Sequence, residues 1–136
     1  MSGDAIVLVG HGARDPAWAA PLERVAEALR ARGNQVRLAF LEFMAPDITT
    51  ALDALYRGGT RNVRVVPVFL GAGGHVARDV GEQVAAARAL RPDLRVALEP
   101  PVGERAEVVE AIADAIAAAG GNRRLAMSPE EFSELR

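Results

Sequence analysis

The sequence contains no cysteine, so disulfide bonds, thiolate zinc sites and cysteine-bound iron–sulfur clusters are excluded. It has no excess of positive charge either: the formal net charge is −2, which argues against a nucleic-acid-binding surface. Long apolar runs are also missing, since the first one, Ala5–Val9, is far too short for a membrane span or a signal-peptide core. We therefore expect a cytoplasmic protein without membrane or nucleic-acid partners.

The composition that remains is typical of one globular domain. The 136 residues are half hydrophobic and one quarter charged, which is enough for a single core and too little for two. We expect the domain to span residues 1–121 and a polar tail to span residues 122–136. In the tail, "SPEE" at Ser128–Glu131 matches a helix capping box and indicates one short helix, the alternative being a loosely docked chain end.

Strand-like and helix-like segments alternate along the chain. Four short apolar runs predict strands, at residues 5–9, 36–41, 63–69 and 95–99, and after each of them apolar residues recur at helical spacing. Asp15–Pro16 and Pro46–Asp47 are typical of helix starts, and glycines at positions 33, 58–59 and 120–121 are typical of helix ends. Trp18 falls on the apolar face of the first predicted helix, where we expect it in the core.

This alternation predicts an α/β fold with a four-stranded parallel sheet and helices on both of its faces. A flavodoxin-like strand order, 2-1-3-4, is the arrangement we expect. In such sheets, ligands bind beyond the carboxyl ends of the strands, at the point where the strand order reverses.

The only two histidines lie in nearly identical phrases, "GHGARD" at Gly10–Asp15 and "GHVARD" at Gly74–Asp79. His11 follows the first predicted strand, and His75 lies in the predicted loop after the third. In the expected order these two strands are neighbours about 4.8 Å apart. Two imidazoles that reach one point suit a divalent transition metal, and with at most one carboxylate they leave coordination positions open. We therefore interpret the two phrases as two sides of one metal site, each formed where a strand end turns into a helix start.

Two further features are predicted at the same edge of the sheet. Glu42 comes just past the second strand, and it is either a site residue or an ordinary surface acid. The loop "LGAGG" contains three glycines, which allow a flat ligand to approach the backbone N–H groups closely. Its residues are Leu70, Gly71, Ala72, Gly73 and Gly74.

The arginine and aspartate of each phrase have two interpretations. Asp15 and Asp79 either fix the tautomer of the neighbouring histidine or, as we favour, are acids at a helix N-terminus. Arg14 and Arg78 either hold carboxylates of a ligand or are solvent-exposed arginines at helix starts.

Three stretches together resemble the motifs of a known family. "VGHGARDP", "FLEFMAPDI" and "VVPVFLGAGGHVARDV" are similar to the corresponding motifs of the small CbiX-type chelatases, the sirohydrochlorin cobaltochelatases and ferrochelatases of cobalamin and sirohaem synthesis. The resemblance covers roughly residues 4–120 in the same order and spacing. Ala13 stands where the family motif usually has serine, so no hydroxyl is available there. "LGAGG" replaces a loop closer to "LAPGG", which changes its rigidity and keeps its backbone donors.

The resemblance implies a lyase-type chelatase that inserts Co²⁺ or Fe²⁺, or Ni²⁺, into sirohydrochlorin with no organic cofactor. It implies that His11 and His75 bind the metal, that His11 accepts a proton, and that Glu42 and the loop 70–74 contact the tetrapyrrole. Arg14 and Arg78 would then hold the carboxylates of the tetrapyrrole. No P-loop pattern is present, so ATP is not expected to take part. Longer family members carry two such domains in one chain, so the resemblance also implies a homodimer.

Three other functions fit parts of the sequence. The domain could bind a metal or a tetrapyrrole and deliver it without catalysis. A histidine-based phosphotransferase is less favoured, because Gly10 rather than an arginine precedes His11. A flavodoxin-like binding module with a phosphate in its glycine loop would leave the paired histidines unexplained.

Overall fold

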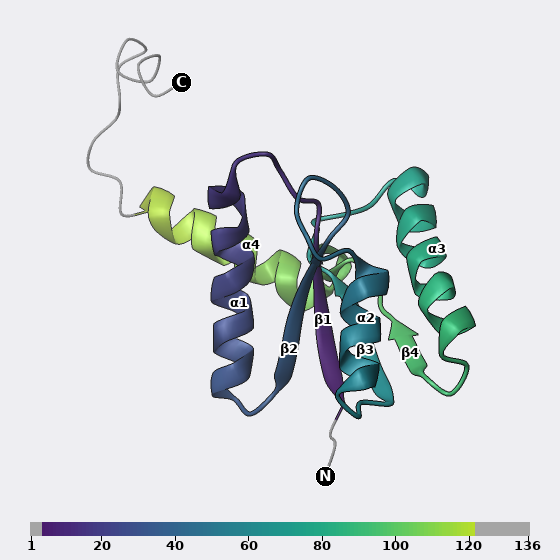
Figure 1. Cartoon of the computed structure of the whole chain (residues 1–136). Coiled ribbons are helices and arrows are strands. Elements are labelled where there is room, and N and C mark those ends of the chain that lie inside the picture. The colour runs from purple at the N-terminus through teal and green to yellow at the C-terminus, as the bar shows by residue number, and fades with distance from the viewer. Residues whose placement is uncertain (1–3, 122–136) are drawn as a thin grey trace. The chain divides into compact units, whose positions relative to one another are not determined.

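The computed structural model describes residues 4–121, in which strands and helices alternate as the sequence predicts (Figure 1). In chain order the elements are β1 (Ala5–Gly10), the 3-10 turn η1 (Pro16–Ala19), α1 (Ala20–Ala31), β2 (Gln35–Phe40), α2 (Ile48–Arg57), β3 (Asn62–Pro67), α3 (Gly74–Leu90), β4 (Arg95–Leu98), the 3-10 turn η2 (Val102–Glu104) and α4 (Ala106–Gly121). The predicted strands are therefore correct to within two residues at each end.

The chain divides into two compact units, Met1–Glu104 and Arg105–Arg136. The first unit contains the sheet and the helices α1 to α3, and the second contains α4. The domain boundary expected after residue 121 stays a prediction, and the short helix expected at Ser128–Glu131 lies outside the described residues. Within residues 4–121, no helix is both long and apolar enough to cross a membrane.

The four strands form one parallel sheet in the order β2-β1-β3-β4, which confirms the predicted topology. The central strand β1 pairs on both sides, so that Val7 lies opposite Arg37 of β2 and Val65 of β3. Because both of its faces are covered, β1 is apolar throughout, as its sequence predicts. This order makes the ends of β1 and β3 neighbours at the carboxyl edge of the sheet.

Alternate residues of β1 supply two separate cores, one on each face of the sheet. Ala5, Val7 and Val9 pack with α2 and α3, whose buried side chains include Leu52 and Val84. On the other face, Ile6 and Leu8 pack with Leu22 and Ala26 of α1. Each fully buried aliphatic side chain contributes roughly 1.5–3 kcal/mol relative to an exposed one, so these two layers hold the carboxyl edge of the sheet rigid.

Side chains cap the helices at the starts that the sequence predicts. Asp47 accepts a hydrogen bond from the Thr50 N–H (2.8 Å) at the N-terminus of α2. Asp15 accepts one from the Ala17 N–H (2.9 Å), but the element it caps is the 3-10 turn η1. Such caps are worth about 1 kcal/mol each.

The prediction that Trp18 lies in the core is wrong. Residues 16–19 form the 3-10 turn η1, and the α-helix begins only at Ala20, so the helical spacing used for Trp18 does not apply there. The indole is 72% exposed.

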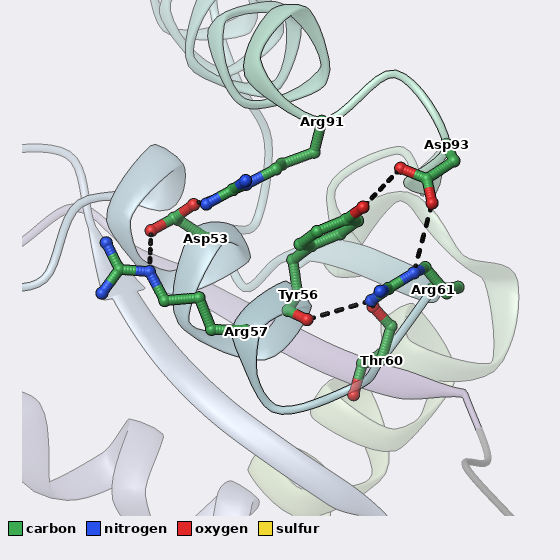
Figure 2. Close-up of polar contacts among 7 residues, drawn as sticks. All are labelled: Asp53, Tyr56, Arg57, Thr60, Arg61, Arg91 and Asp93. Carbon is green, nitrogen blue, oxygen red and sulfur yellow. Dashed lines mark hydrogen bonds and ion pairs between the residues drawn. The ribbon is translucent and has the colours of Figure 1, made fainter.

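A polar network joins the amino ends of β3 and β4 to α2, at the opposite end of the strands from the histidines (Figure 2). The Tyr56 hydroxyl donates to Asp93 Oδ1 (2.7 Å), and Arg61 pairs with the other carboxylate oxygen (3.3 Å) while lying over the Tyr56 ring. The hydrogen bond raises the pKa of Tyr56 and lowers the pKa of Asp93. Asp53 pairs with both Arg57 and Arg91, which ties α2 to the end of α3. This network links structural elements and contains no candidate site residue.

Candidate functional site

His11 lies directly after β1, and its backbone is held by the segment that follows β2. The Leu41 and Glu42 N–H groups donate to the carbonyls of Gly10 and His11, both at 3.1 Å. At Gly12, φ is +90°, and a Cβ there would overlap the Glu42 carbonyl group. The second glycine of "GHG" is therefore required, because it lets the two loops meet backbone to backbone.

The imidazole of His11 stacks on the ring of Phe69. The ring centroids are 4.1 Å apart and the planes differ by 25°. Phe69 lies after β3 and is only 6% exposed, whereas His11 is exposed. Phe69 was not among the residues predicted from the sequence, although its place in "VPVFLGAGGH", directly before the glycine-rich loop, was a usable signal. The first histidine thus stacks on an aromatic ring from the segment that follows the neighbouring strand.

His75 lies in the first turn of α3, and the prediction that it lies in a loop is wrong. The helix begins at Gly74, with Gly73 as its N-cap, so the loop "LGAGG" is shorter than expected. No side chain caps this N-terminus, which leaves first-turn N–H groups available beside the exposed His75. His11 and His75 therefore follow neighbouring strands at the same edge of the sheet, as predicted.

The two histidine phrases do not have equivalent structures. In the first, residues 11–15 form a loop and Asp15 caps η1; in the second, residues 74–79 all belong to α3. Asp79 is neither an N-cap nor a first-turn acid, and its carboxylate accepts a hydrogen bond from the Gln83 side-chain amide (3.4 Å). Our preferred interpretation holds for Asp15 and is wrong for Asp79, because six shared letters do not fix where a helix begins.

Two charged residues lie near His11: Arg14 follows it by three positions, and Glu42 donates its backbone N–H to the His11 carbonyl. The Arg14 guanidinium lies 4.8 Å from the centre of the Phe43 ring, and Phe43 itself has φ of +68° and is 60% exposed. Glu42 is exposed, as are Arg14 and Arg78. All three charged groups are thus accessible to a ligand at this edge.

The glycines of the loop after β3 have no steric reason to be glycine within the described part of the chain. A Cβ at Gly71, Gly73 or Gly74 would meet nothing within 4 Å. Leu70 is 74% exposed and Ala72 is half-buried. Open space on this side of the loop allows a flat ligand to come close to the backbone.

A cavity of about 320 Å³ opens beside His11. Most of its lining is apolar and comes from β1, β2, η1, α1 and the loops after β1, β2 and β3: Gly10, Gly12, Trp18, Pro21, Leu22, Val25, Phe40, Met44 and Val68. Trp18 therefore borders the site instead of filling the core. A larger hollow of about 720 Å³ runs along β2 past Arg14 and Phe43, but neither histidine lines it, so we assign the reacting groups to the cavity beside His11.

Among residues 4–121, no three histidine, aspartate or glutamate side chains lie close enough to form a metal-binding group. A carboxylate therefore does not complete a three-ligand set with both histidines. A metal held by imidazoles alone would keep most of its coordination positions open.

Comparison with known proteins identifies relatives over most of the chain. The family model CbiX matches residues 5–119. A sirohydrochlorin cobaltochelatase of Methanococcus maripaludis is 38% identical over 79 residues, covering 57% of this chain and 55% of the relative. A sirohydrochlorin ferrochelatase of Bacillus subtilis is 29% identical over 110 residues, covering 79% and 42%. The chain thus matches about half the length of these relatives. A cobaltochelatase of Sulfurisphaera tokodaii, 27% identical over 111 residues, is matched over 82% of this chain and 89% of the relative.

Solved structures share the fold. A protein described as a cobalamin biosynthesis CbiX protein from Marinobacter aquaeolei superposes with a TM-score of 0.79 at 26% identity, over 89% of this chain and all of that one. The sirohydrochlorin chelatase SirB of Bacillus subtilis subspecies spizizenii, solved in complex with cobalt, gives a TM-score of 0.73 at 29% identity. That match covers 85% of this chain and 50% of SirB.

Proposed function

The chain belongs to the CbiX family, and on that premise we propose that it inserts a divalent metal ion, Co²⁺ or Fe²⁺, into sirohydrochlorin. The observation that supports this most is the position of the two histidines. Both follow strands that are neighbours in the sheet and both are exposed at its carboxyl edge, where His11 lines an apolar cavity. Parallel sheets bind their ligands at this edge. The relatives named as sirohydrochlorin chelatases supply the substrate class.

We propose that His11 and His75 hold the incoming metal ion, which is a substrate of the reaction. Metal insertion replaces two pyrrole N–H protons by one M²⁺ ion, so the site must accept two protons. Transfer of the metal to the ring frees the imidazole nitrogen of His11, which then accepts one of these protons, and solvent at this exposed site takes the other. Because imidazoles occupy few coordination positions, the pyrrole nitrogens can take the others as the metal is transferred. The reaction as written consumes no nucleotide.

We propose that the tetrapyrrole lies against the exposed loop Leu70–Gly74, with its apolar ring toward the cavity that Trp18 borders. The open space at the loop glycines supports this placement. Carboxylates of the tetrapyrrole would pair with Arg14 and Arg78, which are exposed at the same edge. Glu42, next to His11 through its backbone N–H, would contact the ring from the side of β2.

We also propose that the protein works in the cytoplasm as a homodimer whose two clefts face one another. SirB is about twice as long as the matched region, and a two-fold pair of short chains would supply the same number of domains. Exposed apolar side chains at the carboxyl edge, Trp18, Phe43 and Leu70, give such a pair apolar surface to bury. Light scattering coupled to size-exclusion chromatography tests this, and a monomer at micromolar concentration would contradict it.

The central experiment compares metal insertion by the unaltered protein and by His75→Ala. The absorbance change of metal-free sirohydrochlorin on addition of Co²⁺ or Fe²⁺ measures the rate. We expect multiple turnovers for the unaltered protein and a loss of at least about 100-fold for the variant, since a lost metal ligand and a displaced substrate each cost factors of this order. His75 is exposed, so folding should be unaffected, and circular dichroism checks this. Near-normal rates in the folded variant would remove His75 from the mechanism. Stoichiometric binding without turnover by the unaltered protein would favour the delivery function instead.

A further inference from the structure

We propose that Phe69 is a positioning residue for His11, and that Gly103 of η2 holds Phe69 in place through the backbone of Leu70. The consequence for metal insertion rests on the function proposed above. The structural part of the proposal concerns three contacts within the first unit: Phe69 with His11, Gly103 with Phe69, and Gly103 with Leu70. These contacts can be tested without any substrate. The proposal links η2, in the segment after β4, to the proton-accepting histidine.

The stacked ring fixes the direction of the imidazole. Among residues 4–121, no hydrogen bond or ion pair holds the His11 side chain, so its stacking on Phe69, with ring centroids 4.1 Å apart, restrains rotation of the imidazole. His11 lines the cavity of about 320 Å³ on the α1 side, whereas Phe69 lines a second cavity of about 290 Å³ with Ala72, Val76 and Leu98. The Phe69 ring thus lies between His11 and the second cavity. If it is removed, the imidazole gains an apolar space into which it can turn.

Gly103 fixes the segment that carries Phe69. The Gly103 N–H donates to the Phe69 carbonyl at 2.9 Å. A Cβ on Gly103 would lie 2.7 Å from the Leu70 carbonyl carbon and closer still to Leu70 Cα and O, so only glycine permits this approach. All these contacts are with backbone atoms, which cannot swing aside as the tip of a side chain can. Any side chain at position 103 must therefore displace Leu70 and, with it, the adjoining Phe69.

Gly81 offers a matched control for Gly103. It lies inside α3, and a Cβ there would meet nothing within 4 Å. Gly81→Ala therefore adds the same methyl group without moving a neighbour. It lies outside the residues to which we assign a role in binding or catalysis.

The test measures the chemical shifts of the His11 ring protons by ¹H–¹³C correlation NMR. With only two histidines in the chain, His75→Gln assigns the signals. A ring stacked face to face shifts the His11 ring protons upfield. We expect Phe69→Leu and Gly103→Ala to remove this upfield shift, and Phe69→Tyr and Gly81→Ala to keep it. Circular dichroism establishes that each variant is folded, and Gly103→Ala leaves both rings chemically intact, so it decides the matter if Phe69→Leu does not fold.

Metal insertion by the same variants tests the catalytic part. A reacting group misplaced by about 1 Å can cost on the order of 100-fold. We expect kcat to fall about 10- to 100-fold in Phe69→Leu, with KM for the tetrapyrrole little changed, and to stay near normal in Phe69→Tyr. In Gly103→Ala we expect the same fall in kcat together with a raised KM, because this substitution also displaces Leu70. An unchanged His11 signal in Gly103→Ala would refute the proposal that Gly103 holds Phe69 in place. A lost upfield shift with an unchanged kcat would overturn the positioning role. Absence of insertion by the unaltered protein would refute only the proposed function, since the NMR result stands by itself.

Discussion

Replacement of Gly12 with alanine is expected to destabilise the protein by about 2–5 kcal/mol, because a side chain there meets two separate obstacles. The first is the backbone, since φ of +90° is disfavoured for any residue with a Cβ and costs roughly 1–2 kcal/mol. The second is the Glu42 carbonyl group, which the new Cβ would overlap, and overpacking of this kind costs about 1–3 kcal/mol.

Gly33→Ala separates the two obstacles. Gly33 has nearly the same φ, +91°, but a Cβ there would meet nothing within 4 Å. It should therefore lose only the backbone contribution of about 1–2 kcal/mol. Urea unfolding followed by far-ultraviolet circular dichroism gives both free energies of unfolding, and their difference measures the contact between the loops after β1 and β2.

Equal destabilisation by the two substitutions would refute this reasoning, because it would mean that Gly12 and Glu42 are not in backbone contact. A second consequence follows from the Glu42 N–H, which donates to the His11 carbonyl. If alanine at position 12 separates these loops, His11 moves, and metal insertion should fall in Gly12→Ala and remain normal in Gly33→Ala.

Three further predictions concern single side chains. Trp18 is the only tryptophan, so its fluorescence should be quenched when a tetrapyrrole binds beside His11; unchanged emission at saturation would place the ligand elsewhere. Arg78→Ala should raise KM for sirohydrochlorin about tenfold, as loss of a charge-assisted hydrogen bond predicts, while Arg88→Ala at the far end of α3 should not. Tyr56→Phe should lower the urea midpoint near neutral pH, with the deficit vanishing in acid and in alkali. The lowered pKa of Asp93 stabilises the fold above about pH 4 and loses this effect as pH falls, and the raised pKa of Tyr56 stabilises it below about pH 10 and loses this effect as pH rises. A deficit that does not depend on pH would contradict the assigned hydrogen bond.

The sequence predicted the elements and their order because these depend on local patterns. The continuous apolar run of β1 indicates a strand buried on both faces, and Asp47 marks the start of α2 through a hydrogen bond that spans three residues. Alternation of strands and helices then leaves few topologies, and the order β2-β1-β3-β4 is among them. From this order alone, both histidines could be placed at the carboxyl edge of neighbouring strands.

The sequence was less informative where the outcome depended on how far a helix extends. Trp18 was placed in the core because the helical spacing was continued through η1, and Asp79 was placed at a helix start because its phrase repeats that of Asp15. Helix starts depend on which backbone N–H groups find acceptors, and here Gly73 sets the start of α3 earlier than the repeated letters suggest.

The sequence by itself therefore determined the architecture and the edge at which the chemistry lies, because hydrophobic periodicity and capping act over one or two helical turns. Only the tertiary structure decided how the site is held together. Phe69 under His11, Gly12 against Glu42 and Gly103 against Leu70 each join residues about 30 or more positions apart. Such contacts are set by the packing of whole strands and loops in three dimensions, and no local pattern in the chain encodes which pairs will meet.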